Sequence, residues 1–384
     1  MEWKEYRLGD LLVNYDKHRK PLSAIQRASF KGNYRYYGAQ GVIDYVKDYI
    51  FDGDYMLIAE DGENLNSRNA PIAQLVSGKF WVNNHAHIVK TNDKADMYLL
   101  MLMLNKTNIS AYVTGAAQPK LNQDNLNSIT LRLPPIVTQR RIASILSSLD
   151  DKIAINRRIC ENLEAQAQAL FKHWFIDFAP FKNGKFVESE LGMIPEGWRV
   201  GTLTEIAEYM NGLAMQKFPP LSADDAIPVL KIKELGQSQC DNNSDKCSKQ
   251  IKPEYIIKNG DVVFSWSGTL MVDIWCGGIC GLNQHLFKVT SDNYPKWFFF
   301  RWTKHHLSEF IRIAKDKAVT MGHIKRGDLE KAFVVIPDRN TLDKMSEVME
   351  NIHNQIINTR LESSRLSSLR DTLLPKLMSG EIKV

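Results

Sequence analysis

Basic and aromatic side chains alternate in one short stretch near the start of the chain. Residues 17–41 read KHRKPLSAIQRASFKGNYRYYGAQG and contain no acidic residue. Positive charges bind phosphates, while rings and amides contact bases, so this composition is typical of a loop that follows a nucleic-acid backbone. The alternative is a solvated loop whose aromatic rings pack into the core. The candidate DNA-binding residues of this stretch are Lys17, Arg19, Lys20, Arg27, Lys31, Arg35 and Tyr36.

Two polar loops, TGAAQPKLNQDN from Thr114 and TMGHIKRGD from Thr320, each precede a short strand that ends in proline. Their amide side chains suit adenine, and their lysine and arginine side chains suit guanine, because such pairs can form two hydrogen bonds. An ordinary turn with exposed polar side chains is the alternative. The candidate DNA-binding residues of these loops are Gln118, Lys120, Asn122, His323, Lys325 and Arg326.

The pattern Asn-x-His also occurs twice, as NNH from Asn83 and as NQH from Asn283. Its polar side chains either point into a groove or cap the end of a strand, and the sequence leaves both interpretations open. If they face a groove, the candidate DNA-binding residues are Asn84, His85, Gln284 and His285.

Motifs for catalysis are missing from the sequence. Neither Gly78-Lys79 nor Gly184-Lys185 continues to Ser or Thr, so there is no phosphate-binding loop of the nucleotide hydrolases. Neither proline pair follows Asn or Asp, as the motif of an amino-methyltransferase requires. The spacing of the cysteines matches no common zinc site. We therefore predict a non-catalytic chain with no metal and no cofactor of its own.

The composition is that of an ordinary globular protein, with 44% hydrophobic and 24% charged residues among 384. A chain of this length is expected to form two or three domains. Its net charge of +5 leans toward polyanionic partners without proving one. The charged N-terminus indicates no secretory signal, and five cysteines, an odd number, suit a reducing compartment. We expect a cytoplasmic protein without a membrane partner.

Several short stretches recur about two hundred residues later in the chain. DNLNSITLRLPP at 124–135 matches GDLEKAFVVIPD at 327–338, with its apolar residues 203 positions apart. Leu131 and Leu133 alternate with polar residues, which predicts a strand with one buried face. Stretches around both Asn-x-His patterns match at similar offsets. Repeats of this length are too long for a solenoid and indicate a duplicated domain of mixed α and β structure, an α+β fold.

A seam of apolar residues follows each copy of the proline strand. From Ile142 and again from Met345, these residues are spaced alternately four and three apart over about five heptads. The spacing predicts two helices, each roughly 50–55 Å long. A helix with one apolar stripe needs a partner, and a pseudo-twofold axis between the copies would pair the two helices antiparallel. The seam residues include Leu149, Ile153, Asn156, Leu163, Leu170, Ile352, Ile356, Thr359, Leu366 and Leu373.

These patterns together predict two mixed α/β domains separated by two long helices that form an antiparallel coiled coil. Such a chain is a covalent version of a symmetric dimer, the form in which many proteins bind two half-sites of double-stranded DNA. The expected segments are a first recognition domain at 1–137, a long helix at 138–178, a linker at 179–197, a second recognition domain at 198–338, and a second long helix with the C-terminal tail at 339–384.

The sequence resembles the specificity (S) subunits of Type I restriction–modification enzymes along nearly its whole length. The most specific matches are IPEGW at 194–198 and LRDTLLPKLMSGEIKV at 369–384. Further matches are LPPIVTQRRIASIL at 133–146 and INRRICENLEAQAQALFKHWF at 155–175. The family usually has Glu-Gln before the helical arginine, whereas Thr138-Gln139-Arg140 stands here.

The resemblance implies that two target-recognition domains each read one half of a bipartite, asymmetric DNA sequence. The paired helices would fix the unread spacer and dock two methyltransferase (M) subunits. Those subunits would bring S-adenosylmethionine and methylate adenine, while separate restriction (R) subunits would translocate and cut DNA with ATP and Mg²⁺. An alternative of a different class is a coiled-coil adaptor whose end domains bind proteins. A third is a fragment of a fused enzyme that lacks its catalytic half.

Overall fold

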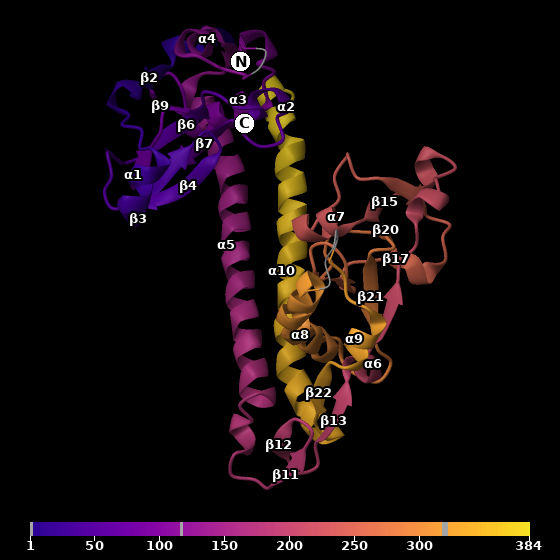
Figure 1. Ribbon diagram of the computed structural model, residues 1–384. Helices are drawn as coiled ribbons and strands as arrows, with labels where there is room; N and C mark the ends of the chain where they lie inside the picture. Colours follow the sequence, from indigo (N-terminus) through magenta and orange to yellow (C-terminus); the bar gives the residue numbers. More distant parts are fainter. Residues whose placement is uncertain (1–2, 116–117, 317–321) are drawn as a thin grey trace. The chain divides into compact units, whose positions relative to one another are not determined.

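The computed structural model describes residues 3–115, 118–316 and 322–384 (Figure 1). Contacts between residues divide the chain into two compact units. Unit 1 consists of Met1–Asp151 together with Leu369–Val384, and unit 2 consists of Lys152–Ser368. Among the described residues, no helix combines the length and the apolar composition needed to cross a membrane.

Unit 1 contains two four-stranded sheets and a separate strand pair. The sheets have the strand orders β2-β9-β6-β7 and β4-β3-β8-β5, and β1 pairs with β10. Strands β3 and β8 run parallel, while the other pairs are antiparallel. The strands are β1 (Lys4–Arg7), β2 (Leu12–Asn14), β3 (Lys31–Gly38), β4 (Gly41–Val46), β5 (Phe51–Asp52), β6 (Tyr55–Ala59), β7 (Ala73–Val76), β8 (Lys79–Val82), β9 (Ala86–Thr91) and β10 (Thr130–Leu133).

Three helices of unit 1, α1, α3 and α4, begin at a residue whose side chain caps the helix. Asp96 accepts a hydrogen bond of 2.9 Å from the backbone N–H of Leu99 and so starts the third helix. In β10, Leu131 and Leu133 are buried while Thr130 and Arg132 are exposed, as their alternation predicts. The helices are α1 (Ala24–Ser29), α2 (Asn64–Ser67), α3 (Met97–Lys106), α4 (Gln123–Ser128), the first part of α5 (Ile136–Phe175) and the end of α10 (Arg339–Ser379).

Unit 2 has two four-stranded sheets of its own, with the orders β14-β21-β18-β19 and β16-β15-β20-β17. Strand β13 pairs with β22, and the segment expected to be a linker contains the hairpin β11–β12. The strands are β11 (Phe186–Ser189), β12 (Gly192–Pro195), β13 (Arg199–Thr202), β14 (Glu208–Asn211), β15 (Ala226–Leu230), β16 (Lys246–Ser248), β17 (Ile256–Ile257), β18 (Val262–Ser265), β19 (Met271–Ile274), β20 (Cys280–Leu282), β21 (Leu286–Thr290) and β22 (Phe333–Ile336). Between them lie α6 (Leu203–Ile206), α7 (Ile232–Gln237), α8 (Lys296–Asp316) and α9 (Arg326–Glu330).

The two units repeat one topology, sheet by sheet. The order β2-β9-β6-β7 corresponds to β14-β21-β18-β19, and β4-β3-β8-β5 corresponds to β16-β15-β20-β17. The parallel pair also recurs, since β3 runs parallel to β8 and β15 runs parallel to β20. In both units, the strand that ends in proline pairs with the first strand of the copy. The predicted duplication of a mixed α and β domain is confirmed.

The core of unit 1 draws on both ends of the chain. Leu8 lies near the N-terminus and Ile142 on α5, and both are at most 1% exposed. Leu374 and Leu377 of α10 pack into the same cluster, each 2% exposed. The last turns of α10 therefore complete a domain whose other residues precede them by more than 200 positions.

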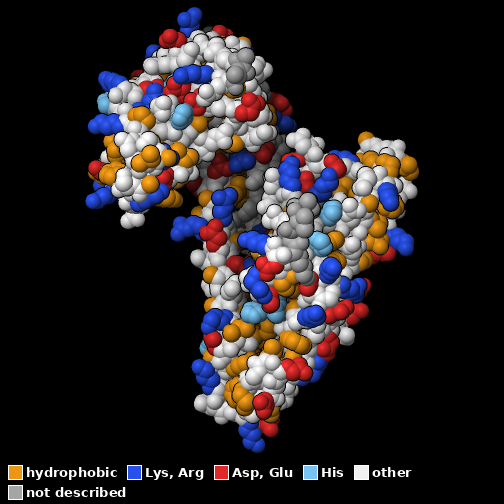
Figure 2. All heavy atoms as spheres, viewed as in Figure 1, with side chains coloured by type: hydrophobic (Ala, Val, Ile, Leu, Met, Phe, Trp, Pro, Cys, Tyr) orange, Lys and Arg blue, Asp and Glu red, His pale blue; other side chains and the backbone are white. Residues whose placement is uncertain are grey.

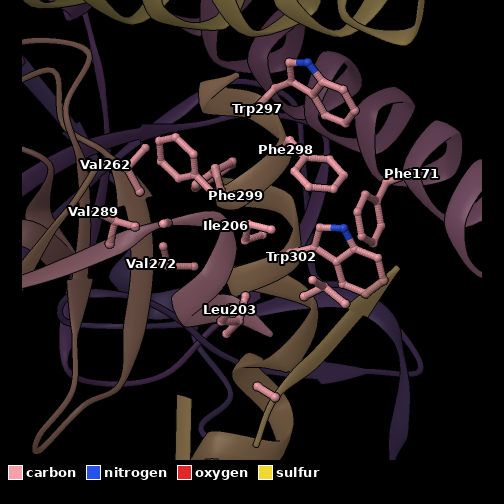
Figure 3. Packing of buried hydrophobic residues seen from close by; sticks show 14 of the residues in the cluster. Phe171, Leu203, Ile206, Val262, Val272, Val289, Trp297, Phe298, Phe299 and Trp302 are labelled. Carbon is pink, nitrogen blue, oxygen red and sulfur yellow. The ribbon is translucent and has the colours of Figure 1, made fainter. Parts of the chain in front are cut away.

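The core of unit 2 is built around aromatic rings of α8 (Figure 3). The helix begins KWFFFRW, and this sequence places Trp297, Phe298 and Trp302 in the core with at most 2% exposure. Phe171 of α5 packs edge-on against Trp302, with the ring centres 5.0 Å apart (Figure 3). The long helix α5 is thus part of the hydrophobic core of this unit.

The two long helices run antiparallel, as predicted. In unit 2, Asn156 of α5 donates a hydrogen bond of 2.6 Å to the Glu362 carboxylate of α10. Further along α5, the Cys160 thiol lies 3.8 Å from the carbonyl oxygen of Ile356. Because the residue numbers rise along one helix and fall along the other, the chain directions are opposite.

Every predicted seam residue is buried or half-buried. Helix α5 has 40 residues and a length of about 60 Å. Its central rung Asn156 is only 1% exposed, and the Oδ1 atom of this side chain has no hydrogen-bond partner. The seam therefore packs at the expected spacing, with one poorly satisfied polar group in its middle.

Candidate nucleic-acid interface

Each Asn-x-His pattern forms a tight turn between two strands, β8 and β9 in unit 1 and β20 and β21 in unit 2. Asn83 Oδ1 accepts a hydrogen bond of 2.9 Å from the backbone N–H of His85, and Asn283 Oδ1 accepts one of 3.2 Å from His285. Both asparagines are buried. The first residue of the pattern therefore shapes the turn, and the next two residues carry the side chains that the turn presents.

In unit 1, the turn presents Asn84 and His85, both exposed. His85 Nδ1 lies 2.6 Å from Asp61 Oδ2, so the carboxylate fixes the orientation of the ring. Asp61 also forms a β-bridge with Lys120, which brings the predicted polar loop beside the turn. An amide, an imidazole, a carboxylate and an ammonium group thus share one surface, with donors and acceptors for base edges.

The other residues of the two predicted loops have different environments. Gln118, Lys325 and Arg326 are exposed. Asn122 is exposed too, but its Oδ1 accepts a hydrogen bond of 2.8 Å from the N–H of Asn125 and so caps α4. Both loops are only partly described, because the following loop residues lie outside the described residues: Ala116, Ala117, Thr320 and Met321.

In unit 2, the turn presents Gln284 and His285, both half-buried. Gln284 Nε2 lies 3.3 Å from His285 Nε2, and His285 Nδ1 lies 3.1 Å from Ser267 Oγ. Ser267 forms a β-bridge with His323 of the second loop. In both units, therefore, the Asn-x-His turn, the end of the neighbouring strand and the polar loop of that unit lie together. Their chemistry differs, because Ser267 stands where unit 1 has Asp61.

A cavity of about 650 Å³ opens beside the turn of unit 2. Gln284 and His285 line it together with three lysines, Lys231, Lys233 and Lys246. The antiparallel pairing of β15 with β16 brings these lysines together from separate segments. They belong to no local motif, so the sequence did not single them out. Asp245 also lines the cavity and is ion-paired with Lys231. Ammonium groups beside an amide and an imidazole are the groups that a site for phosphates and base edges requires.

Tyr36 is fully buried, with 0% exposure, so the prediction that it contacts DNA is wrong. Its hydroxyl accepts a hydrogen bond of 2.9 Å from the N–H of Leu22, and the guanidinium of Arg27 lies 5.2 Å from its ring centre. Arg27 also donates to Asp44 at 3.1 Å and to the carbonyl oxygen of Leu22 at 2.7 Å. Both side chains therefore brace the loop from within.

Arg19 connects the basic stretch to the turn of unit 1. Its Nη1 atom donates to Glu60 at 2.6 Å and to the carbonyl oxygens of Asn84 at 3.3 Å and Ala86 at 3.0 Å. The guanidinium of Arg19 therefore forms its hydrogen bonds within unit 1 and fixes the basic stretch beside the turn. The other basic candidates of the stretch are exposed, namely Lys17, Lys20, Lys31 and Arg35.

In the described part of the chain, one group of three side chains could hold a metal ion. The ligand atoms of Asp16, Glu60 and His87 all lie within 4.8 Å of one another. Arg19 lies against it, 2.6 Å from Glu60 and 3.5 Å from Asp16. Burial raises the pKa of Asp16, but the hydrogen bond and charge of His87 outweigh it, and the pKa lies below its usual value. The guanidinium already balances the carboxylates, so this group is an ion-pair network that anchors the turn.

Lys and Arg side chains are spread over the visible face of both units, with Asp and Glu among them (Figure 2). This distribution agrees with a net charge of only +5. Contacts to a polyanion would therefore come from a few basic groups near each turn.

Known proteins match this chain over most of its length. A family described as Type I restriction modification DNA specificity domain matches residues 1–165 and 195–363. The specificity subunit of the type I restriction enzyme MjaIX from Methanocaldococcus jannaschii is 29% identical over 341 residues, covering 84% of this chain and 78% of that protein. The specificity subunit of the type I restriction enzyme HindI from Haemophilus influenzae is 22% identical over 464 residues, covering 99% of this chain and 100% of that protein.

A solved structure has the same fold. The crystal structure of the S subunit of a Type I restriction–modification system from M. genitalium aligns with a TM-score of 0.62, over 98% of this chain and 96% of that one. The sequence identity is 13%, so this likeness concerns the fold alone.

Proposed function

This chain belongs to the family of Type I restriction modification DNA specificity domains, and we propose that it is the DNA-reading specificity subunit of a Type I restriction–modification complex. Each unit reads one half of a bipartite sequence in double-stranded DNA. The observation that carries this proposal is the recurrence of one surface in both units. It is formed by the Asn-x-His turn, the end of the adjacent strand and the polar loop of each unit.

The two half-sites have different sequences. Unit 1 presents Asn84 and the pair of His85 with Asp61, whereas unit 2 presents Gln284 and the pair of His285 with Ser267. Base pairs are distinguished by their patterns of donors and acceptors in the major groove. Because equivalent positions carry different donors and acceptors, the two units select different bases and the full site is asymmetric.

Phosphate contacts set the register of each unit on the duplex. In unit 2, Lys231, Lys233 and Lys246 line the cavity that also contains Gln284 and His285. In unit 1, the exposed Lys17 and Lys20 flank Arg19, which donates a hydrogen bond to the carbonyl oxygen of Asn84 in the turn. This division of labour, with lysines on the backbone and amides or imidazoles on the bases, is common among proteins that read DNA.

The paired helices set the length of the unread spacer between the half-sites. We propose residues 1–137 and 198–338 as the recognition domains and residues 179–197 as the linker. Residues 138–178 and 339–384 are then the spacer segments. The antiparallel contacts of α5 with α10 support a rod of defined length.

The same helices dock two methyltransferase subunits, and restriction subunits join that complex. Val137, Ile145 and Ile155 on α5 and Val348 and Leu369 on α10 are each at least 40% exposed, which supports a protein-binding role for these outer faces. Methylation of adenine with S-adenosylmethionine, and cleavage with ATP and Mg²⁺, belong to those partners. The cytoplasm remains our prediction for the compartment.

Sequencing of methylated DNA tests the proposal. Cells would express this chain with its methyltransferase subunit, and we expect a bipartite adenine-methylated motif with a gap of constant length. A continuous motif, or no motif while the methyltransferase is active, would contradict the assignment.

A pair of variants separates reading from anchoring. Gln284→Ala should relax the base preference in one half-site only, because it removes an amide without touching the lysines. Lys233→Ala should leave the motif unchanged and weaken binding to all sequences, with the slope of affinity against salt reduced by about one. If both variants change the motif in the same way, the assigned roles are incorrect.

A further inference from the structure

Ile25 and Leu221 are the most exposed large hydrophobic side chains in the described part of the chain, at 84% and 80%. The next value is 59%, for Val137. Single exposed aliphatic residues are normal on protein surfaces and need no explanation by themselves. These two, however, occupy the same loop of the two repeats.

The loop is identified by a shared tetrapeptide. Residues 21–24 and residues 220–223 both read PLSA, although the surrounding sequences differ. In both units this segment lies between the first strand of one sheet, β2 or β14, and the parallel strand of the other, β3 or β15. The exposed residue is Leu221 within the second copy and Ile25 directly after the first. Each loop tip therefore carries one aliphatic side chain in solvent.

Hydrogen bonds brace the loop of unit 1. Ser23 caps α1 by accepting a hydrogen bond of 3.2 Å from the N–H of Gln26, whose side chain accepts one of 2.8 Å from the N–H of Ser23. Arg27 donates a hydrogen bond of 2.7 Å to the carbonyl oxygen of Leu22, and the Tyr36 hydroxyl accepts one of 2.9 Å from the N–H of Leu22. Ile25 is thus presented from a short, doubly braced helix.

The loop of unit 2 is braced by other residues to the same effect. Asp225, 4% exposed, accepts a hydrogen bond of 3.0 Å from the N–H of Leu221. The carbonyl oxygen of Phe218 accepts one of 2.9 Å from the N–H of Ser248 in β16. An apolar side chain held in water by a fixed backbone loses little conformational freedom when it is buried against a ligand.

Both loops are joined to the turns that present the reading residues. In unit 1, Arg19 donates to the carbonyl oxygen of Asn84 at 3.3 Å. In unit 2, Leu213 forms a β-bridge with Asn283, and a Cβ atom added to Gly212 would lie 2.2 Å from the Asn283 carbonyl oxygen. Only glycine allows this approach. The segment then continues through Met215, which lines the same cavity as Gln284.

We propose that Ile25 and Leu221 are wedges that enter the base stack of bound DNA, each unstacking one step beside its half-site. The proposal rests on the proposed function and adds how each unit deforms its target. An aliphatic wedge gains by leaving water and partly separates two base pairs, which kinks the duplex.

Fluorescence of 2-aminopurine, which rises when this base loses stacking, locates the wedges. The full complex of this chain with its methyltransferase subunits would bind duplexes that carry the probe at successive positions in and beside each half-site. For the wild type, we expect a rise at one step per half-site. Ile25→Ser should abolish the rise beside the half-site of unit 1 only, and Leu221→Ser the rise beside the other. Affinity should fall roughly tenfold for each, as expected when one buried aliphatic side chain is truncated.

Three controls make the result specific. Leu191→Ser changes a 46% exposed leucine in the β11–β12 hairpin and should alter neither the fluorescence nor the affinity. Ile25→Leu and Leu221→Ile should retain both signals because they keep an aliphatic tip. Specific, salt-sensitive binding by the wild type without any rise, or a rise that persists in the serine variants, would overturn the wedges and leave the reading function standing. Equal affinity for target and random duplexes would overturn both.

Discussion

The buried Arg301 joins three helices of unit 2 through an ion pair and a hydrogen bond, and the ion pair allows a test of what stabilises this unit. Glu164 lies on α5, Arg301 on α8 and His353 on α10. Arg301 is 2% exposed and donates two hydrogen bonds of 2.8 Å to the Glu164 carboxylate and one of 3.0 Å to His353 Nε2. We predict that Glu164→Gln destabilises unit 2, because it leaves a buried guanidinium beside a neutral amide.

The pKa of Glu164 gives the magnitude. Burial raises this pKa, but the hydrogen bonds and charge of Arg301, with the charge of Lys304, lower it further, to about 2 from 4.5. A lowering of the pKa by about 2.5 corresponds to at most about 3 kcal/mol in the free energy of unfolding. The Glu164 side chain is 32% exposed, so solvent screens part of this contribution. We therefore expect Glu164→Gln to lower the free energy of unfolding of unit 2 by about 2 kcal/mol at pH 7.

The sign of the pH dependence follows from the lowered pKa. Ionised Glu164 stabilises the folded unit fully above about pH 4.5, and this contribution is lost as the pH falls from 4.5 toward 2. The difference between the wild type and Glu164→Gln should therefore be large at pH 7 and much smaller at about pH 3. His353 is neutral at pH 7, because burial and the neighbouring Arg301 lower its pKa to about 3, so it adds no second positive charge beside Arg301.

Urea unfolding followed by tryptophan fluorescence measures the effect, since six of the eight tryptophans lie in unit 2. Glu309→Gln is the matched control on α8, the helix that carries Arg301, because Glu309 pairs with Arg312 at the surface and its loss should change the free energy of unfolding by less than about 0.5 kcal/mol. The reasoning is refuted if Glu164→Gln lowers the free energy of unfolding by less than about 1 kcal/mol at pH 7, or by as much at about pH 3 as at pH 7.

Three further predictions use other parts of the chain. Asn156→Leu removes a buried oxygen without a partner, and water can replace the lost hydrogen bond to Glu362 because that side chain is 47% exposed. The substitution should therefore raise the free energy of unfolding of unit 2 by about 1 kcal/mol in the same urea assay, where a decrease would count against it. Tyr36→Phe removes the hydroxyl bonded to Leu22 and should speed hydrogen exchange in β3 while leaving the methylated motif unchanged; an altered motif would restore Tyr36 as a DNA contact. Seven residues inserted in both α5 and α10 lengthen each helix by about 10 Å and should widen the unread gap by about three base pairs, whereas an unchanged gap would exclude the helices as its determinant.

Elements that depend on neighbours in the sequence were predictable. The alternation around Leu131 and Leu133 specifies which face of β10 is buried, because side chains alternate across a strand. The heptad spacing from Ile142 likewise specifies the buried side of α5, because every third or fourth residue lies on the same face. Because the sequence repeats, the same predictions applied to β22 and α10 in the second half of the chain.

Residues whose partners are distant in the sequence were not predictable. Tyr36 lies in a basic and aromatic stretch, yet its side chain is fully buried and its hydroxyl accepts a hydrogen bond from the backbone N–H of Leu22. Lys231 and Lys246 share a cavity only because β15 pairs with β16 across a long loop. Register between strands is fixed by packing over the whole sheet, and no local pattern encodes it.

The closure of unit 1 by α10 has a consequence for synthesis on the ribosome. Leu374 and Leu377 are translated more than 200 residues after Leu8 and Ile142, whose cluster they complete. At about 5–20 residues per second, the apolar surface of unit 1 waits on the order of ten seconds or longer for its last side chains. A nascent chain interrupted within α10 keeps that surface open to chaperones and proteases. Truncated products are thereby exposed to disposal before they can direct modification or cleavage to the wrong place in the genome.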